Sequence, residues 1–330
     1  MTGSWIGLDP ESVEQVKAVA DSTSLADNVA PLSGHILESM GSGHDEYLLL
    51  RVDGQLAGVA VARERDPVEL FVPPAHRRRG HGEELVDRAL ARSGAVWAHG
   101  DLPAARALAD RLGLVKSREL LQMRRSLSRE WAAAQVAAAP VPAGIRLRSF
   151  VPGRDEEQFL LVNSRAFDWH PEQGRLNLAG LQAEMAQAWF DAEGFLLAVD
   201  EADTVLGFHW TKIHPAGPGA APVAGPAPAA SAAPVAGSAP EPGRGAGVDP
   251  AAESVGEVYV LGVDPSARVA GAPVRGLGAP LTAAGLAYLA ARGQQRVLLY
   301  VEGDNSKALN LYSRMGFRTS TSDVVYRLPD

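Results

Sequence analysis

"VELFVPPAHRRRGHGEELVDRALARSGAVWAHGD", residues 68–101, contains the pattern that decides the fold. An apolar run leads into the loop Arg77-x-x-Gly80-x-Gly82, which opens a helical stretch and then a second apolar run. The following residues, "LPAARALADRLGLVKSRELLQMRR" at 102–125, add a helix that ends at Gly113 and another strand. The order strand, glycine loop, helix, strand, helix, strand is typical of an α/β domain.

The second half of the chain repeats this order. Its parts are "EVYVLGVDPSAR" at 257–268, "RGLGAPLTAAGLAYLAARGQQRVLLYVEGDN" at 275–305 and "SKALNLYSRMGFRTSTSDVVYRL" at 306–328. In both halves the last helix ends at a glycine before an apolar residue, Gly113 before Leu114 and Gly316 before Phe317, as a left-handed cap requires. The repeat predicts two α/β domains of one fold.

Two interruptions divide the chain. The residues PVPAG at 140–144 follow an alanine-rich helical stretch and precede a new strand, which predicts domains at 1–139 and 140–330. Between 215 and 252, Ala, Pro and Gly replace every large apolar side chain. Such a segment cannot bury enough surface to offset its ordering entropy, so we expect a flexible insertion in the second domain. With 330 residues, 46% of them hydrophobic, the chain is long enough for two cores.

Composition narrows the classes of function. The net charge of -8 and the one tight basic run, Arg77–Arg79, argue against a broad nucleic-acid surface and favour a small anionic ligand. The absence of cysteine excludes disulfides, thiolate metal sites and a cysteine acyl intermediate. His170, His209 and His214 are scattered, so we expect no metal. Without a leader or an apolar run of membrane-spanning length, we expect a cytoplasmic monomer with no membrane partner.

The glycine loop at 77–82 has the composition of a phosphate cradle. Glycines let the backbone approach a ligand closely, successive amides point outward, and the start of the next helix adds partial positive charge. A pyrophosphate would therefore be bound largely by main chain. The alternative is a tight strand-to-helix turn with solvated arginines.

The loop "RRRGHG" after a strand and the closing "NLYSRMGF" resemble the GCN5-related N-acetyltransferases, whose acyl-CoA pyrophosphate sits on such a loop. With "HPEQG", "FHWTKIHP", "GEVYVLGVDP" and "LLYVEGDN", the chain is similar to tandem members that acetylate the cysteinyl amine of a cysteine, glucosamine and inositol conjugate. The resemblance covers nearly the whole chain except the insertion. It implies two tandem α/β domains, each with a mixed, mostly antiparallel sheet flanked by helices, and acetyl-CoA as acetyl donor. The alternatives are transfer to another amine, such as an aminoglycoside or a protein N-terminus, and a non-catalytic acyl-CoA-binding module.

Two residues of the second half suit acetyl transfer to an amine. The reaction needs a base for the ammonium, a donor to the tetrahedral oxyanion and a proton for the departing thiolate. Glu257 could take the amine proton, directly or through water, Tyr312 could protonate the sulfur, and a backbone amide of 261–263 could meet the oxyanion. The resemblance implies these roles for Glu257 and Tyr312. Taken singly, a solvated edge glutamate and a packed tyrosine are the alternatives.

Alignment of the two halves separates their roles. When the halves are matched on their shared prolines and helix-ending glycines, Asp66 falls opposite Glu257 and Ala109 opposite Tyr312. The first half therefore lacks the phenol and has a shorter acid. We expect it to bind CoA or brace the second half without turnover.

The resemblance also implies the binding residues. Glu172 and Lys212 are polar groups flanked by aromatic residues, as in sugar or amine pockets, and with Glu257 and Tyr300 they match substrate-binding positions. In the first half, the residues expected to contact acetyl-CoA are Leu70, Phe71, Val72, Arg78, Arg79, Gly80, His81, Gly82 and Glu83. In the second half they are Leu261, Gly262, Val263, Arg268, Arg275, Gly276, Leu277, Gly278, Ala279, Asn305, Ser306, Lys307, Ala308, Leu309 and Asn310. The strand ends at 70–72 and 261–263 would pair with pantetheine amides.

Two features depart from the family pattern. Gly34 stands where related chains carry a glutamate that reaches the substrate, so that contact is lost or supplied by His35 or Glu38. In the second glycine loop, "VAGAPV" at 269–274 adds about five residues before Arg275. The insertion could spoil the cradle, but surface loops absorb added residues at little cost, and we expect it to bulge outward.

Overall fold

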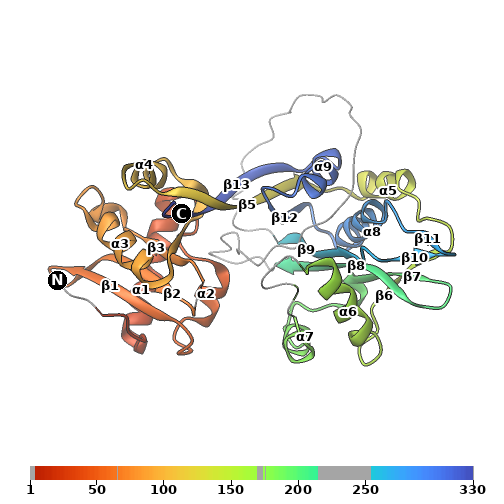
Figure 1. The fold of residues 1–330 in the computed structure, drawn as a ribbon, viewed down its shortest axis with the longest axis horizontal. Coiled ribbons are helices and arrows are strands. Elements are labelled where there is room, and N and C mark those ends of the chain that lie inside the picture. The colour runs from red at the N-terminus through yellow and green to blue at the C-terminus, as the bar shows by residue number, and fades with distance from the viewer. Residues whose placement is uncertain (1–3, 65, 169–173, 175, 215–253, 330) are drawn as a thin grey trace. The chain divides into compact units, whose positions relative to one another are not determined.

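The computed structural model describes residues 4–64, 66–168, 174, 176–214 and 254–329. Contacts divide the chain into two compact units, whose described parts lie within 4–120 with 321–329 and within 121–214 with 254–320 (Figure 1). The insertion predicted at 215–252 lies outside the described residues. Among the residues that are described, we find no helix with the length and apolar character needed to cross a membrane.

The first unit is built on strands in the order β1-β2-β3-β4-β13-β5. Its elements are α1 Pro10–Asp27, α2 Gly34–Ser39, β1 Glu46–Val52, β2 Gln55–Ala62, β3 Val68–Phe71, α3 His81–Ser93, β4 Ala95–Ala98 and α4 Pro103–Arg111, together with β5 Val115–Ser126 up to residue 120 and β13 Arg318–Arg327 from residue 321, because the remaining residues of these two strands belong to the second unit. The pairs β1/β2, β2/β3 and β4/β13 are antiparallel, and β3/β4 is parallel. The sheet is mixed and mostly antiparallel, as expected.

Alternation along β2 places helices on both faces of the first sheet. Val59 and Val61 belong to a buried cluster with α1 and α2, whereas Ala60 and Ala62 belong to one with α3 and α4. A strand that is buried on both faces has a nearly continuous apolar sequence, and "LAGVAVA" in β2 is such a sequence.

The second unit has the strand order β5-β12-β9-β8-β7-β6. Its elements are α5 Arg129–Ala138, β6 Ile145–Ser149, α6 Glu156–Ala166, α7 Leu178–Met185, β7 Phe195–Asp200, β8 Val205–His214, β9 Val255–Val263, β10 Arg268–Val269, β11 Ala272–Pro273, α8 Gly278–Ala291, β12 Arg296–Glu302 and α9 Ser306–Arg314. Strands β6 to β9 are antiparallel, and β9/β12 is parallel.

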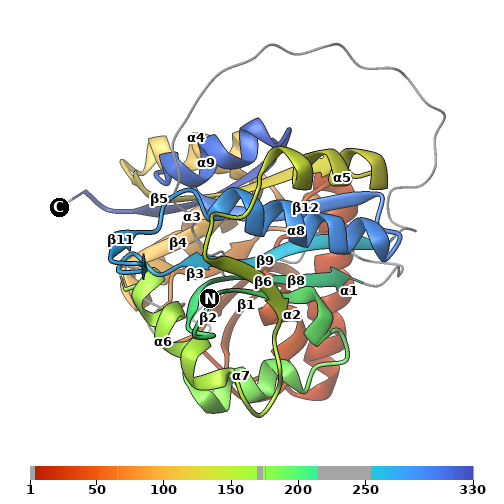
Figure 2. The same cartoon turned by 90° about the vertical axis from the view of Figure 1, so that its right-hand side faces the viewer.

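Two helical layers cover the second sheet. Figures 1 and 2 show α5, α8 and α9 on one face and α6 and α7 on the other. The first layer buries Leu286 and Leu289 of α8 against the sheet, and the second buries a stack in which the Phe195 ring lies 4.4 Å from Phe150 and 4.5 Å from Trp210. Successive side chains of β7 belong alternately to the two clusters, so the clusters lie on opposite faces of the sheet.

The contacts divide the chain differently from the sequence-based limits at 1–139 and 140–330. Helix α5 packs in the second unit, where the Arg129 guanidinium donates to the last carbonyls of α8 at 3.2 and 2.9 Å. The end of β13 lies in the first unit, where Asp323 accepts a hydrogen bond from Gly100 N at 2.7 Å. Both placements are set by distant packing partners, which the local sequence does not reveal.

Candidate active site

Strand β9 has two irregularities that open its edge. Trp210 pairs with Val260 and Thr211 with Val258, so Tyr259 is the extra residue of a β-bulge. The parallel register with β12 covers three pairs and ends at Val258 and Leu299. Past that point the backbone groups of 261–263 on the β12 side are not paired with β12. The strand end expected to bind pantetheine therefore has the geometry that such pairing needs.

Glu257 lies on β9 directly across from Lys212 of β8. Its carboxylate is buried, and Oε2 lies 2.5 Å from Nε2 of His214, two residues further along β8 on the same face. Lys212 instead places its ammonium 4.4 Å from the Trp189 ring and 5.1 Å from the Tyr259 ring. A carboxylate, an imidazole and an ammonium backed by aromatic rings therefore share one face of the sheet.

Tyr300 stands on the same face as Glu257. Leu298 of β12 pairs with Glu257, and Tyr300 follows two residues later. The Tyr300 hydroxyl is buried and accepts a hydrogen bond from the Gln122 amide at 2.7 Å. Gln122 in turn accepts from Arg124 Nε at 2.6 Å. The phenol is thus held in a polar network of the second unit.

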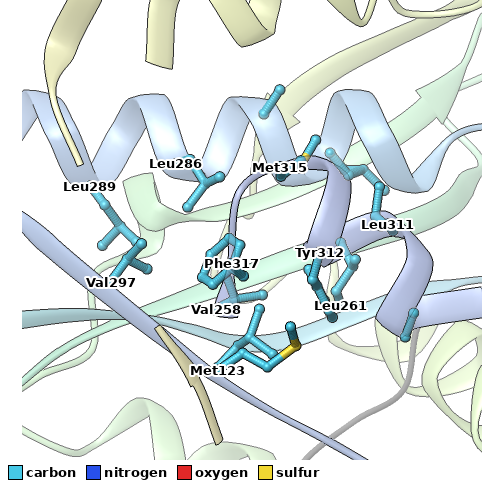
Figure 3. Close-up of a cluster of buried hydrophobic side chains, with 14 of the residues drawn as sticks. Met123, Val258, Leu261, Leu286, Leu289, Val297, Leu311, Tyr312, Met315 and Phe317 are labelled. Carbon is cyan, nitrogen blue, oxygen red and sulfur yellow. The ribbon is translucent and has the colours of Figure 1, made fainter. Parts of the chain in front are cut away.

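Tyr312 of α9 lies on the opposite face of the sheet, the one covered by α5, α8 and α9. It is 1% exposed and packs in the cluster that contains Val258, Leu261 and Phe317 (Figure 3). Burial raises the pKa of the Tyr312 hydroxyl above its ordinary range. Among the described residues, none is hydrogen-bonded to that hydroxyl. The Tyr312 hydroxyl is therefore protonated at neutral pH and could donate its proton to a ligand that reaches it.

Glu257 and Tyr312 do not touch one another. The carboxylate lies on the face covered by α6 and α7 and the phenol on the face covered by α5, α8 and α9, because Val258, the neighbour of Glu257, points into the cluster of Tyr312. The place where β9 and β12 part lies between these two faces. A thioester entering there could meet both groups.

The first unit has neither group. A Gly-Asp pair follows both β4 and β12, and it aligns these two strands with each other. The residue of β3 that pairs with a given position of β4 then corresponds to the residue of β9 that pairs with the same position of β12, which matches Val68 to Val258. This match places Pro67 at the position of Glu257, which corrects the sequence alignment that chose Asp66. The one-residue offset comes from the bulge in β9, which lengthens that strand before its proline.

Ala109 matches Tyr312 through the ends of their helices. The Ala109 carbonyl accepts the amide of Leu114 at 2.9 Å, and the Tyr312 carbonyl accepts that of Phe317 at 3.0 Å. Both bonds skip a left-handed glycine, as in a Schellman cap. The first unit therefore has a methyl group where the second has a phenol.

The first glycine loop joins β3 to α3. Arg77 is bound in an ion pair to Asp27 at 2.6 Å, whereas Arg78 and Arg79 are exposed, and Arg78 and Gly80 have φ of 62° and 90°. Glu83, in the first turn of α3, pairs with Arg111 at 2.7 Å. This carboxylate and its neighbour Glu84 already offset the positive helix end, which weakens its attraction for an anion.

The second glycine loop contains the inserted residues as a separate hairpin. β10 pairs with β11 around Ala270 and Gly271, whose φ values of 48° and 80° suit a two-residue turn. The Val274 amide donates to the Ala267 carbonyl at 3.0 Å, so the chain leaves and returns at one point. Beyond the hairpin, Arg275 is exposed.

Helix α8 follows Gly276, which has φ of 71°, and begins at Gly278. Its first turn contains no acidic residue, unlike that of α3. The first amides of any helix lack an acceptor within it, so this end can receive an anion. At the start of α9, the Asn305 side chain caps the helix by accepting from Ala308 N at 3.0 Å.

Comparison with known proteins places the chain in a family. The sequence profile of the Acetyltransferase (GNAT) family matches residues 20–114 and 163–317. The chain belongs to the GNAT family of acetyltransferases. It is 43% identical over 330 residues to the mycothiol acetyltransferase of Nocardia farcinica, covering 97% of this chain and 95% of that one. It is 40% identical over 334 residues to that of Saccharomonospora viridis, covering 97% and 96%.

Solved GNAT structures share the fold. A GCN5-related N-acetyltransferase from Sphaerobacter thermophilus aligns with a TM-score of 0.65 at 20% identity, over 98% of this chain and 94% of that one. A tandem GNAT protein from the clavulanic acid biosynthesis pathway aligns with a TM-score of 0.59 at 17% identity, over 100% and 99%. The tandem α/β architecture expected from the sequence is thereby confirmed.

Some expected GNAT residues stay without a structural role. Glu172 lies outside the described residues. Gly34 begins α2 in the first unit, and His35 and Glu38 beside it are exposed. No group of three or more His, Asp or Glu side chains within the described ranges is placed to hold a metal.

Sequence reasoning missed His214, the ring that contacts Glu257 in this GNAT chain. The scatter of His170, His209 and His214 along the sequence predicts no metal site and indicates no other role for His214. A usable signal was present: Lys212 and His214 alternate on one strand, and an antiparallel strand carrying Glu257 follows. The register of β8 and β9 decides which of their residues pair. The bulge at Tyr259 shifts this register by one residue, and the sequence does not reveal the shift.

Proposed function

We propose that this chain transfers the acetyl group of acetyl-CoA to the cysteinyl amine of a cysteine, glucosamine and inositol conjugate, as a mycothiol acetyltransferase. The observation that carries the proposal is 40% and 43% identity, over 97% of the chain, to two proteins of that name. The side chains beside Glu257 in the second unit support this proposed activity. Lys212 offers a donor to hydroxyl groups, and the Trp189 and Tyr259 rings offer apolar surface to a sugar.

Acetyl-CoA is proposed to bind the second unit along β9 and α8. The unpaired edge at 261–263 would bond the pantetheine amides, and the amides from Gly276 to Ala279 would meet the pyrophosphate. Arg268, which begins the hairpin, and Arg275, which lies just beyond it, are exposed and add positive charge. The absence of an acidic residue in the first turn of α8 supports this fit.

In the proposed reaction, Glu257 takes a proton from the substrate ammonium, directly or through water. The amine nitrogen then forms a bond to the thioester carbon, while an amide of 261–263 donates to the oxyanion. As the carbon–sulfur bond breaks, the thiolate takes the Tyr312 proton, and the phenolate regains a proton from the nitrogen. Amide and CoA thiol are formed, and the proton on Glu257 returns to solvent.

The first unit is proposed to be non-catalytic. Pro67 and Ala109 stand where the second unit has its acid and its phenol. Leu70 to Val72 and the loop up to Glu83 remain candidates for a second acetyl-CoA, which calorimetry would count as two sites rather than one. The cytoplasm and the monomeric state remain part of this proposal, and light scattering tests the latter.

Mass spectrometry of acetyl-CoA with the desacetyl conjugate tests the substrate. We expect one added acetyl group on the cysteinyl nitrogen, and faster transfer than to an aminoglycoside or a peptide N-terminus. A preference for either of those amines would replace our substrate. Tight acetyl-CoA binding without transfer to any of the three amines would favour the binding module instead.

Variants test the mechanism. Glu257→Gln and Tyr312→Phe are each expected to lower kcat by about 10²- to 10⁴-fold with little change in acetyl-CoA affinity, because both groups act on protons in the transition state. Glu193→Gln, whose side chain is 77% exposed, is the matched control and should retain full activity. Near-normal kcat in both active-site variants would remove the mechanism.

A further inference from the structure

His214 contacts the Glu257 carboxylate and leaves one of its oxygens open. The ring nitrogen Nε2 lies 2.5 Å from Oε2, and the two side chains are 15% and 5% exposed. A carboxylate only accepts hydrogen bonds, so Nε2 carries the proton and donates it. No other hydrogen bond to this carboxylate is found among the described residues. Oε1 is thus the atom left for a ligand.

The Lys212 ammonium does not perform the same task. Lys212 is directly opposite Glu257 in the register, yet its ammonium lies against the Trp189 and Tyr259 rings. A glutamate side chain has several rotatable bonds, and its orientation is lost unless a neighbour holds it. His214, at the end of a paired strand, is a rigid ring that can do so.

We propose that His214 is a positioning residue for acetyl transfer. By donating to Oε2 it turns Oε1 of Glu257 toward the amine, either directly or toward a water between them. The inference rests on the proposed function, because it assigns Glu257 the role of base. His214 touches Glu257 and not the reacting atoms, and it neither gains nor loses a proton when Oε1 accepts one from the amine.

Three substitutions of His214 test this geometry. His214→Leu removes the donor, His214→Asn keeps an amide too short to reach Oε2, and His214→Gln places an amide nitrogen near the position of Nε2. We expect Leu and Asn to lower kcat by about 10- to 100-fold, with the KM for acetyl-CoA changed less than about threefold. Gln should recover most of the loss. His44→Leu, at an exposed histidine of the first unit, is the control and should match the parent protein.

A double variant separates positioning from a structural role. In a Glu257→Gln background, His214→Leu should have little further effect on kcat, because its action passes through the carboxylate. Full kcat in His214→Leu, equal loss in the Gln and Asn variants, or additive losses in the double variant would each overturn the inference. If His214→Leu does not fold, the comparison of Gln with Asn decides the question alone.

A spectroscopic measurement tests the hydrogen bond between His214 and Glu257 separately from the proposed function. If the parent protein acetylated no amine, the proposed function would fall, and NMR of the His214 ring would still test the bond. The Nε2–H proton should exchange slowly in the parent and quickly in Glu257→Leu. Equally fast exchange in both proteins would show that the imidazole does not hold the carboxylate.

Discussion

His209 shows how one buried side chain sets the position of the helix behind the second glycine loop. Its Nδ1 lies 2.8 Å from the Leu281 carbonyl oxygen of α8. Burial lowers the pKa of this imidazole to about 4, so the ring is neutral near pH 7 and can donate to the carbonyl. One turn further on, a Cβ at Gly285 would lie 2.1 Å from the ring. Glycine at this position lets the helix approach the strand.

Substitution of Gly285 tests this close approach. Gly285→Ala is expected to reduce the free energy of unfolding by about 1–3 kcal/mol, because the added methyl group overlaps a ring that cannot move out of the core. Urea denaturation measures the change. Gly7→Ala is the control, since a Cβ there meets nothing within 4 Å and the substitution should be nearly neutral. Equal midpoints for the two variants would contradict the packing argument.

The inserted hairpin explains why a longer loop can keep its glycine turn. The two strands pair with each other, and the Val274 to Ala267 hydrogen bond closes the base of the insertion. The added residues therefore do not have to change the path of the chain from Arg275 onward. The sequence predicted a bulge here but not a hairpin, because the turn residues Ala270 and Gly271 are a weak signal compared with Asn-Gly.

Removal of the hairpin tests this independence. Deleting residues 269–273 and changing Val274 to Gly should leave the KM for acetyl-CoA within about threefold, since the chain from Arg275 onward is unchanged. Val269 and Val274 are both partly buried, so we also expect a stability loss below about 2 kcal/mol. Gly276→Ala is the contrast: its φ of 71° strains any other residue and should raise KM. A large KM increase in the deletion variant would mean that the hairpin itself takes part in binding.

Strand β13 completes the first unit. Asp323 of β13 lies 3.4 Å from Nδ1 of His99, and Glu69 of β3 lies 3.1 Å from Nε2. Burial works against a charged imidazole, but the two carboxylates outweigh it and raise the His99 pKa to about 10. Burial likewise opposes the Glu69 carboxylate, yet His99 and the Ser33 hydrogen bonds hold its pKa below the usual range.

This buried cluster predicts a pH-dependent stability. A raised histidine pKa contributes stability that is complete below about pH 6.5 and disappears as the pH rises through about 10. The lowered Glu69 pKa adds stability above pH 4.5 that is lost as the pH falls further. His99→Gln should therefore cost about 3–5 kcal/mol near pH 6 and much less at pH 10. Urea unfolding at several pH values measures the difference, with exposed His44→Gln as control; a difference independent of pH would refute the ion-pair account.

Local sequence was sufficient for the elements and for the family. The glycine loops, the helices ending at Gly113 and Gly316, and the repeated strand order depend on neighbouring residues, because backbone propensity and helix capping act over a few positions. The candidate residues Glu257 and Tyr312 could be chosen for the same reason: their neighbours carry the family pattern.

Which of these residues meet depends on the tertiary structure. The contact between His214 and Glu257 needs the register of two strands separated by the insertion, and that register includes a bulge. The placement of α5 in the second unit and of Asp323 in the first follows from packing partners more than 100 residues away. Hydrogen bonds and apolar contacts at such separations depend on the folded path of the whole chain, so no local pattern can encode them.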